Sequence, residues 1–258
     1  MKKVSLITST VIALTTSAMA DNIGGEVAIG LWNHDPSGWI QYPANSTDAN
    51  KVDLDKDLNL NTKSEVYIRA KIEHPIPLIP NIRLAYTQVH SNGDAVSTRD
   101  FNFGNEKFTA NAAITTDAQL DSFDATLYYE IIDVGFDADV GITFRYIDGY
   151  TDLYATGGGL VSPLHQRNNI SAIIPMIYGN VRVPLPFLDN LSIGAEGNFI
   201  TYDSNTVYDL QADVRYEFFM GLGVEAGIRV QKYKLDDIDD TSSDIDIEGF
   251  FIGAVWDF

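Results

Sequence analysis

The residue types that most often perform chemistry are sparse in this 258-residue chain, which has four histidines and no cysteine. Without cysteine the chain has no thiolate nucleophile, disulfide or thiolate metal site. His90 and Ser91 could be the base and nucleophile of a hydrolase, but adjacent residues of a strand point to opposite faces. His165 lies near Ser162, but no third residue that could complete a catalytic triad with them is identifiable. The same holds for His34. We therefore predict no catalytic residues and no enzyme activity.

Two acidic stretches have part of the spacing of a calcium loop. In "VDLDKDLNLN" (52–61) the aspartates alternate, but Leu58 stands where a calcium loop needs glycine. In "DDIDDTSSDIDIE" (236–248) Glu248 is correctly placed, but Ser242 replaces the glycine. We predict no metal site and no cofactor. Divalent cations that bridge the acidic loops to lipopolysaccharide phosphates are the alternative.

The chain is strongly acidic, with 17 basic and 36 acidic residues and a net charge of −19. This charge argues against a nucleic-acid partner, because phosphates need lysine and arginine for neutralisation. Residues 1–20 combine a basic start at Lys2 and Lys3 with a short apolar run and the small residues "SAMA". This is the pattern of a cleavable secretory signal peptide. We predict cleavage after Ala20 and one barrel domain over residues 21–258.

Alternation of apolar and polar residues with a period of two recurs after residue 20 and predicts strands. In 208–218, apolar residues from Tyr208 to Phe218 alternate with charged and amide residues. Most of the predicted strands are 9 to 14 residues long. A usual globular strand has about 5–6 residues, whereas a tilted membrane-crossing strand needs about 9–11. The ten predicted strands lie near 24–32, 64–74, 81–90, 119–131, 136–148, 169–183, 190–202, 207–218, 222–235 and 245–258.

The connections between these strands alternate between short and long. Turns such as "DVG" (133–135) and "MGLG" (220–223) are short, and 203–206 is a short exception among the others. The long, polar connections are 33–63, 92–118, 149–168 and 236–244. This alternation predicts an all-β, membrane-spanning, antiparallel up-and-down β-barrel with short periplasmic turns and long extracellular loops. Residues 97–114 are expected to form a loop hairpin around "FGNEK", and a twelve-strand barrel is the alternative.

Charge indicates how the strand faces are oriented. We expect the apolar faces to point to lipid and the polar faces to point into a narrow lumen. Opposite charges must pair there, because an unpaired buried charge is costly. A soluble lipocalin-type barrel with an apolar lumen is the alternative. The predicted lumen charges are Glu65, Arg69, Glu130, Arg145, Glu196, Arg215, Glu217, Glu225 and Arg229.

The last predicted strand ends in aromatic residues. Phe250, Ile252, Trp256 and Phe258 share one face, and aromatic side chains are enriched where a barrel meets the membrane interfaces. A terminal strand of this kind resembles the signal by which outer-membrane proteins are delivered for insertion. We therefore expect the barrel-insertion machinery as a partner, together with outer-membrane lipid and lipopolysaccharide.

Five segments are spread along nearly the whole chain after residue 20: "VDLDKDLNL" (52–60), "EHPIPLIPNIRLAYT" (73–87), "DATLYYEIID" (124–133), "LSIGAEGN" (191–198) and "GLGVEAGIR" (221–229). Their combination resembles a family of small proteobacterial outer-membrane β-barrel proteins. The resemblance implies a barrel in the outer membrane of a Gram-negative bacterium, and it implies no activity. We expect a non-enzymatic protein of the cell envelope. It would be either a narrow, porin-like pore for small solutes or a structural protein that acts through its loops. The alternatives are an outer-membrane lipid or peptide hydrolase and a conduit for hydrophobic molecules.

Overall fold

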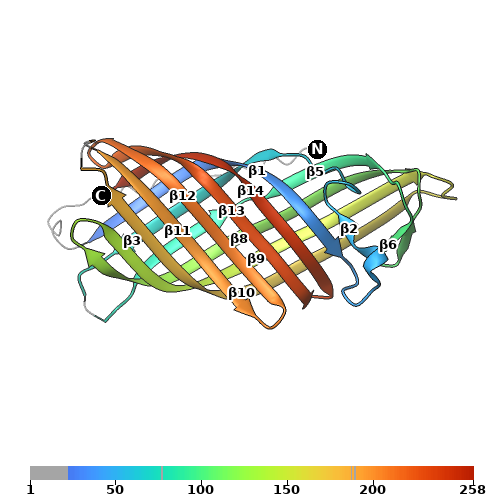
Figure 1. Ribbon diagram of the computed structural model, residues 1–258, viewed down its shortest axis with the longest axis horizontal. Coiled ribbons are helices and arrows are strands. Elements are labelled where there is room, and N and C mark those ends of the chain that lie inside the picture. The colour runs from blue at the N-terminus through green and yellow to red at the C-terminus, as the bar shows by residue number, and fades with distance from the viewer. Residues whose placement is uncertain (1–22, 77, 187, 189) are drawn as a thin grey trace, which may run out of the picture.

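The structure is a computed structural model that describes residues 23–258 except residues 77, 187 and 189. The signal peptide predicted at residues 1–20 lies outside the described residues. The chain forms a closed antiparallel barrel in which strands follow one another around the ring in chain order (Figure 1). The ring strands are β1 (Gly24–Gln41), β3 (Lys63–Glu73), β4 (Asn81–Thr87) with β5 (His90–Val96), β8 (Ala112–Asp133), β9 (Asp137–Gly157), β10 (Leu164–Pro184), β11 (Leu191–Tyr202), β12 (Asn205–Phe219), β13 (Leu222–Ile238) and β14 (Thr241–Asp257).

The ring has ten positions, because β4 and β5 both pair with β8 and together make one wall strand. The ten predicted strands are therefore confirmed. The short strand β2 (Val52–Asp53) adds only to the side of β1. The twelve-strand alternative is wrong for the described chain, since β6 (Phe101–Phe103) and β7 (Glu106–Phe108) form a separate two-stranded hairpin.

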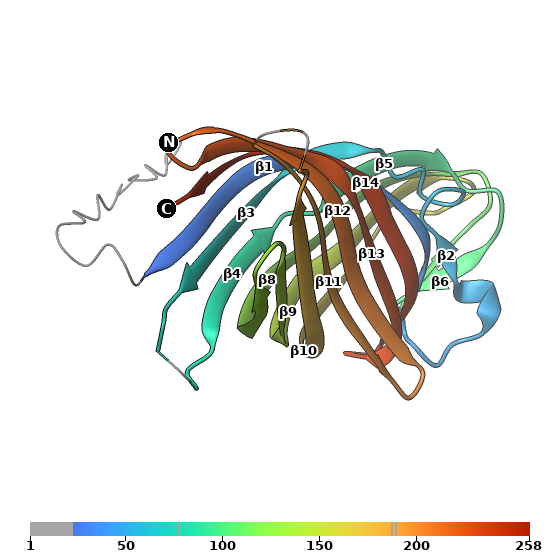
Figure 2. The same ribbon diagram turned by 60° about the vertical axis from the view of Figure 1, so that its left-hand side comes forward.

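The first and last strands close the barrel. β1 pairs with β14 from Glu26–Asp257 to Gln41–Ser242. Gly25 and Phe258 also exchange two backbone hydrogen bonds of 2.9 Å. Figure 2 shows β1 and β14 side by side at this closure. Among the described residues of the apolar belt outlined below, the closed ring pairs the strands on both sides except at 173–176 of β10, whose β11 side is unpaired; such pairing is what a membrane-spanning sheet requires.

A belt of exposed apolar side chains surrounds the end of the barrel that carries the short turns; we call this end the lower end. On β14 the belt includes Phe250, which is 71% exposed, and Ile252, which is 62% exposed. Trp256 and Phe258 point outward at the lower end with their rings 4.9 Å apart. Such a belt with aromatic residues at its edge is the surface that a bilayer covers. No helix among the described residues is long and apolar enough to cross a membrane.

The polarity of the wall inverts above the belt. On β14 the outward residues change from Phe250 in the belt to Glu248 and Asp246 above it, while the inward residues stay apolar at Ile247 and Ile245. The same inversion occurs on β9, β10 and β13. This part of the wall is built like a water-soluble barrel, with its apolar face inside. We call it the upper barrel (residues 33–62, 89–121, 147–172 and 232–248).

The upper barrel corrects the expected content of the long connections. Residues 149–168 were expected to be a loop, but β9 continues to Gly157 and β10 begins at Leu164. Likewise β1 extends to Gln41, and β8 begins at Ala112. The polar outward residues of these extensions give them the composition of a loop. Polar and apolar residues still alternate in these extensions, but the polar residues point outward and the apolar residues inward, because water replaces lipid outside the wall.

Two apolar clusters fill the upper barrel. The first is a cap near the top, where the β6–β7 hairpin inserts Phe101 and Phe108 as a stacked pair with centroids 5.1 Å apart. β2 and β6 mark this end in Figure 1, opposite the C-terminus. The second cluster lies nearer the belt and includes Ile147, Tyr233 and Ile247. The predicted loop hairpin is thus confirmed, and its aromatic residues close the barrel from above.

Glycines make room for the largest side chain of the lower lumen. Tyr67 on β3 lies over Gly30 on β1 and Gly253 on β14, and a Cβ atom at either glycine would overlap its ring or hydroxyl. The Tyr67 hydroxyl donates a 3.0 Å hydrogen bond to Glu225. Glycine at these two strand positions therefore leaves the space in which the Tyr67 side chain crosses the lumen. The two glycines weaken the strands to some extent.

We predict that Gly30→Ala lowers the free energy of unfolding by about 1–3 kcal/mol, because an overpacked lumen must displace Tyr67 or the backbone of β14. The measurement is the urea midpoint of the refolded protein. Gly179→Ala is the matched control, since a Cβ there meets only one atom, at 3.9 Å. Equal midpoints for the two variants would contradict this packing.

Candidate functional site

The lumen inside the belt is crossed by buried ion pairs. A lower quartet joins two arginines and two glutamates from four strands. Arg69 contacts Glu26 at 2.8 Å and Glu225 at 2.9 Å. Arg215 contacts the same two glutamates at 2.6 and 2.9 Å. Each charge of the quartet therefore has two partners of opposite sign, and all four side chains are buried.

An upper quartet lies where the belt meets the upper barrel. Arg145 donates two hydrogen bonds of 2.7 Å to Asp124 and a third of 2.5 Å to Asp209. Arg229 holds Asp209 through two bonds of 2.8 and 2.6 Å. Gln231 adds a bond of 2.9 Å to Asp209. Such bidentate, charge-assisted bonds are the strongest that side chains form.

A further bridge joins two facing walls of the ring. Arg83 on β4 pairs with Glu196 on β11, which also accepts a 3.0 Å bond from Tyr178. The quartets and the bridge contain equal numbers of positive and negative groups. They are Arg69, Arg83, Arg145, Arg215 and Arg229 with Glu26, Asp124, Glu196, Asp209 and Glu225.

The structure places the predicted lumen charges at different depths. Glu65 and Glu217 are half-buried, and Glu130 is exposed at the lower mouth. The six members that lie buried in the network are Arg69, Arg145, Glu196, Arg215, Glu225 and Arg229.

The predicted set omits one acidic group of the upper quartet, Asp209. Asp209 accepts bonds from Arg145, Arg229 and Gln231. Its position on the polar face of 208–218, four residues before Asp213, was the signal that could have identified it.

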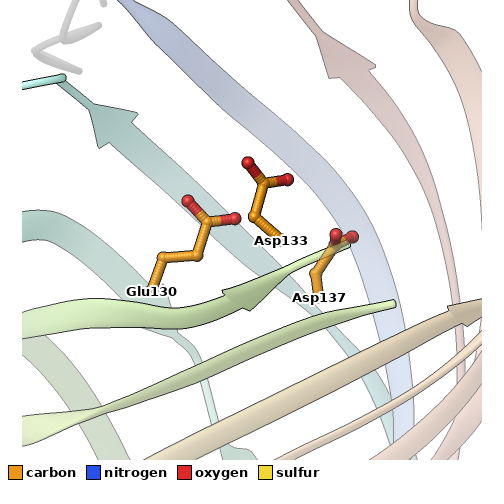
Figure 3. A group of neighbouring side chains, drawn as sticks. All are labelled: Glu130, Asp133 and Asp137. Atoms are coloured by element: carbon orange, nitrogen blue, oxygen red, sulfur yellow. The ribbon is translucent and has the colours of Figure 1, made fainter. Parts of the chain in front are cut away.

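Three carboxylates gather at the lower mouth. They are Glu130, Asp133 and Asp137, whose side chains Figure 3 shows close together. One carboxylate oxygen of each lies within 4.8 Å of the other two. Oxygen ligands of this kind suit Ca²⁺ or Mg²⁺, so these three residues could hold a divalent cation. All three are exposed, and exposed acidic groups are common in proteins without an ion. They lie at the end opposite the acidic loops where the sequence suggested cations.

The acidic stretch 52–61 is shaped by its own hydrogen bonds. Asp53 accepts from the backbone N–H groups of Asp55 and Lys56 at 3.1 and 2.9 Å. Burial alone would raise the pKa of Asp53, but the hydrogen bonds from Lys56 hold that pKa below its usual value. Asp57 is paired with Arg99 at 2.5 Å. Asp53 and Asp57 therefore stabilise the local structure of this segment. Cation binding by the acidic loops stays a prediction.

The histidines do not form a catalytic set in the described chain. His165 lies 2.6 Å from Asp152, and His90 lies 3.2 Å from Asp121. Both pairs are on the outer wall, away from the lumen. His34 is fully buried inside beside Trp32, but neither of its ring nitrogens has a hydrogen-bond partner. Ser91 donates to the Asn61 carbonyl oxygen at 2.7 Å, so it is not paired with His90.

The upper barrel encloses an apolar cavity of about 70 Å³. Its walls come from most of the strands around the ring and from the segment 52–62 that spans the top of β1 and β5. A second cavity, of about 220 Å³, opens at the lower mouth and is lined by charged residues such as Lys71, Asp139 and Arg182. The upper cavity and the lower cavity share no lining residue, and the ion-pair network lies between them.

Comparison with known proteins places the fold but no activity. No family model and no curated protein sequence matches the chain. The outer-membrane protease OmpT of Escherichia coli is similar in structure, with a TM-score of 0.54 and 12% identity over 95% of this chain and 99% of that chain. The translocator domain of the autotransporter NalP of Neisseria meningitidis has a TM-score of 0.45 and 12% identity, over 92% of this chain and 88% of that chain. At these identities the similarity shows the fold of an outer-membrane β-barrel alone.

We predict that Asp209→Asn lowers the free energy of unfolding by about 3–5 kcal/mol, because it leaves Arg145 and Arg229 without their shared counter-charge. The urea midpoint of the refolded barrel measures the loss. Asp148→Asn, an exposed position on the outer wall of β9, is the control and should shift the free energy by less than about 0.5 kcal/mol. If Asp209→Asn lowered the free energy of unfolding by no more than the control does, the charges of the upper quartet would not depend on one another.

Proposed function

We propose that this barrel resides in the outer membrane as a closed, non-enzymatic protein that works through its upper barrel. The fold of outer-membrane barrels and the apolar belt support the location. A signal peptide at residues 1–20 and a terminal strand read by the insertion machinery complete the route to the membrane. The outward exposure of Phe250, Ile252, Trp256 and Phe258 is compatible with that role. The resemblance to small proteobacterial outer-membrane barrels supports the same assignment.

One observation carries the closed state: arginines and carboxylates from different walls meet inside the belt at hydrogen-bonding distance. Arg69 on β3 reaches Glu225 on β13, and Arg83 on β4 reaches Glu196 on β11. Barrels of about eight strands are filled by their own side chains, and open channels belong to much wider barrels. A ten-strand ring crossed by these pairs leaves no route for an ion unless several buried pairs separate.

A non-enzymatic role is supported by the position of the polar groups. The two His–carboxylate pairs face outward, and a protease or lipase would need such groups facing one another across a substrate site. The protease OmpT shares only the fold at 12% identity. The chemistry of the described lumen residues is that of structural ion pairing.

A through-going conduit for hydrophobic molecules fits the geometry less well. Tyr233 lines the apolar cavity and accepts a 3.2 Å hydrogen bond from Arg145, a completely buried member of the upper quartet, so the quartet lies directly behind the cavity wall. An apolar molecule that continued downward would have to displace paired charges, which costs several kcal/mol for each unpaired group. The upper barrel is therefore the part available for binding, and the lower barrel is its membrane anchor.

We predict that the refolded protein is silent in planar bilayers, without discrete openings. Arg215→Ala should also be silent, because the upper quartet and the Arg83–Glu196 bridge still close the lumen. Correct folding is checked on the same preparation by far-UV circular dichroism. Discrete single-channel openings of the wild-type protein would overturn the closed-barrel proposal and restore the small-solute pore.

A further inference from the structure

We infer that the upper barrel binds one small, uncharged, apolar molecule in the cavity between its two apolar clusters. This inference rests on the proposed function, because the cavity is a separate compartment only while the ion-pair network below it is closed. The lining is mainly aliphatic. It comprises Pro36, Ile40, Leu54, Leu60, Val89, Ala118, Leu120, Ile170, Leu235, Ile245 and Ile247, with eight polar or aromatic residues between them.

The polar residues of the lining include several that are already satisfied within the protein. Asn168 donates to Thr241 at 2.9 Å, and Ser243 donates to the Tyr233 carbonyl oxygen at 3.0 Å. Ser91 is likewise bonded to a backbone carbonyl oxygen. Among the residues that the structure describes, no charged side chain lines the cavity. A charged or strongly polar ligand would lose its hydration there without gaining partners, whereas an apolar ligand loses nothing.

The size of the cavity sets the size of the ligand. A water needs roughly 10–15 Å³, and an engineered apolar cavity of about 150 Å³ stays dry and binds benzene. The cavity of about 70 Å³ lies between these limits. Water inside it would find few hydrogen-bond partners, and its volume is less than half of that which holds benzene, so the space favours a short alkyl group or a single apolar atom instead of a ring.

The wall of the cavity has a seam through which such a molecule can enter. β10 pairs with β11 only from Ile177 downward, so residues 164–176 have no strand on that side. The tip of the β13–β14 hairpin covers this edge through two side-chain bonds. Asn168 reaches Thr241, and the backbone N–H of Ser171 reaches Asp239 at 3.3 Å. Both Asn168 and Thr241 line the cavity.

The seam opens next to the apolar belt. Ile173 and Ile177 on the outer face of β10 are 69% and 70% exposed, the highest values along that strand's belt residues. An apolar molecule dissolved at the upper edge of the bilayer therefore meets apolar side chains up to the seam. Opening the seam breaks two side-chain bonds, whereas opening any fully paired part of the wall breaks a ladder of backbone bonds.

The experiment uses xenon as the probe and the full chain refolded into nanodiscs, with ¹²⁹Xe NMR to follow binding against empty nanodiscs. We expect saturable binding at one site. Ala118→Leu, which fills the cavity, should weaken that binding at least tenfold. Ala195→Leu makes the same change on the outward face of β11 and should leave binding unchanged.

Thr151→Leu is the second cavity-filling variant, for use if Ala118→Leu does not fold; Thr151 also lines the cavity. Absence of saturable binding to the wild-type protein, or equal binding by the cavity-filled variant, would overturn the inference. Bilayer currents recorded on the same preparation separate the two proposals. A silent barrel without binding rejects the ligand site alone, whereas a conducting barrel rejects the closed state on which the site depends.

Discussion

The constraint on which this structure depends is that charges inside a lipid-covered wall must neutralise one another. Side chains of each strand alternate between the lipid-facing belt and the lumen. Many of the side chains that point into the lumen are arginine, aspartate or glutamate. Two quartets and one bridge pair them in equal numbers, and no member of this network is exposed. The pairing fixes how strands far apart in the chain face one another, because Arg69 and Glu225 meet only in one register of the closed ring.

The same alternation produces a second compartment once the strands leave the belt. Outside, water replaces lipid, so the outward residues become polar and the inward residues become apolar. The aromatic cap from the β6–β7 hairpin then has a core to pack on, and the apolar cavity lies between that cap and the charged quartet. The barrel thus combines a membrane-embedded part with a polar interior and an upper barrel with an apolar interior. A ligand site can therefore exist in the upper barrel without an open pore.

Much of this arrangement follows from sequence. Period-two alternation in segments such as 208–218 fixes the strands and their faces, and strand length distinguishes a spanning barrel from a globular sheet. The upper barrel was not predicted because outward polar residues such as Asp152 and Arg167 look like loop residues when an outward apolar face is assumed. The ion-pair partners within the network could not be predicted from the sequence either. Asp209 and Arg145, for example, are 64 positions apart and meet only after the ring closes. Sequence periodicity gives the face of a residue, and tertiary closure decides which charge it meets.

A double-mutant cycle on Arg83 and Glu196 tests the central claim most directly. Arg83 has Glu196 as its sole ion-pair partner among the described residues, so the cycle isolates one contact across the lumen. The free energies of unfolding of Arg83→Ala, Glu196→Ala and the double variant are measured in urea. Mutual neutralisation predicts a coupling of about 1.5 kcal/mol or more, with the double variant less destabilised than the sum of the two single variants. Strictly additive losses would contradict it, and would mean that the lumen charges are hydrated independently of one another.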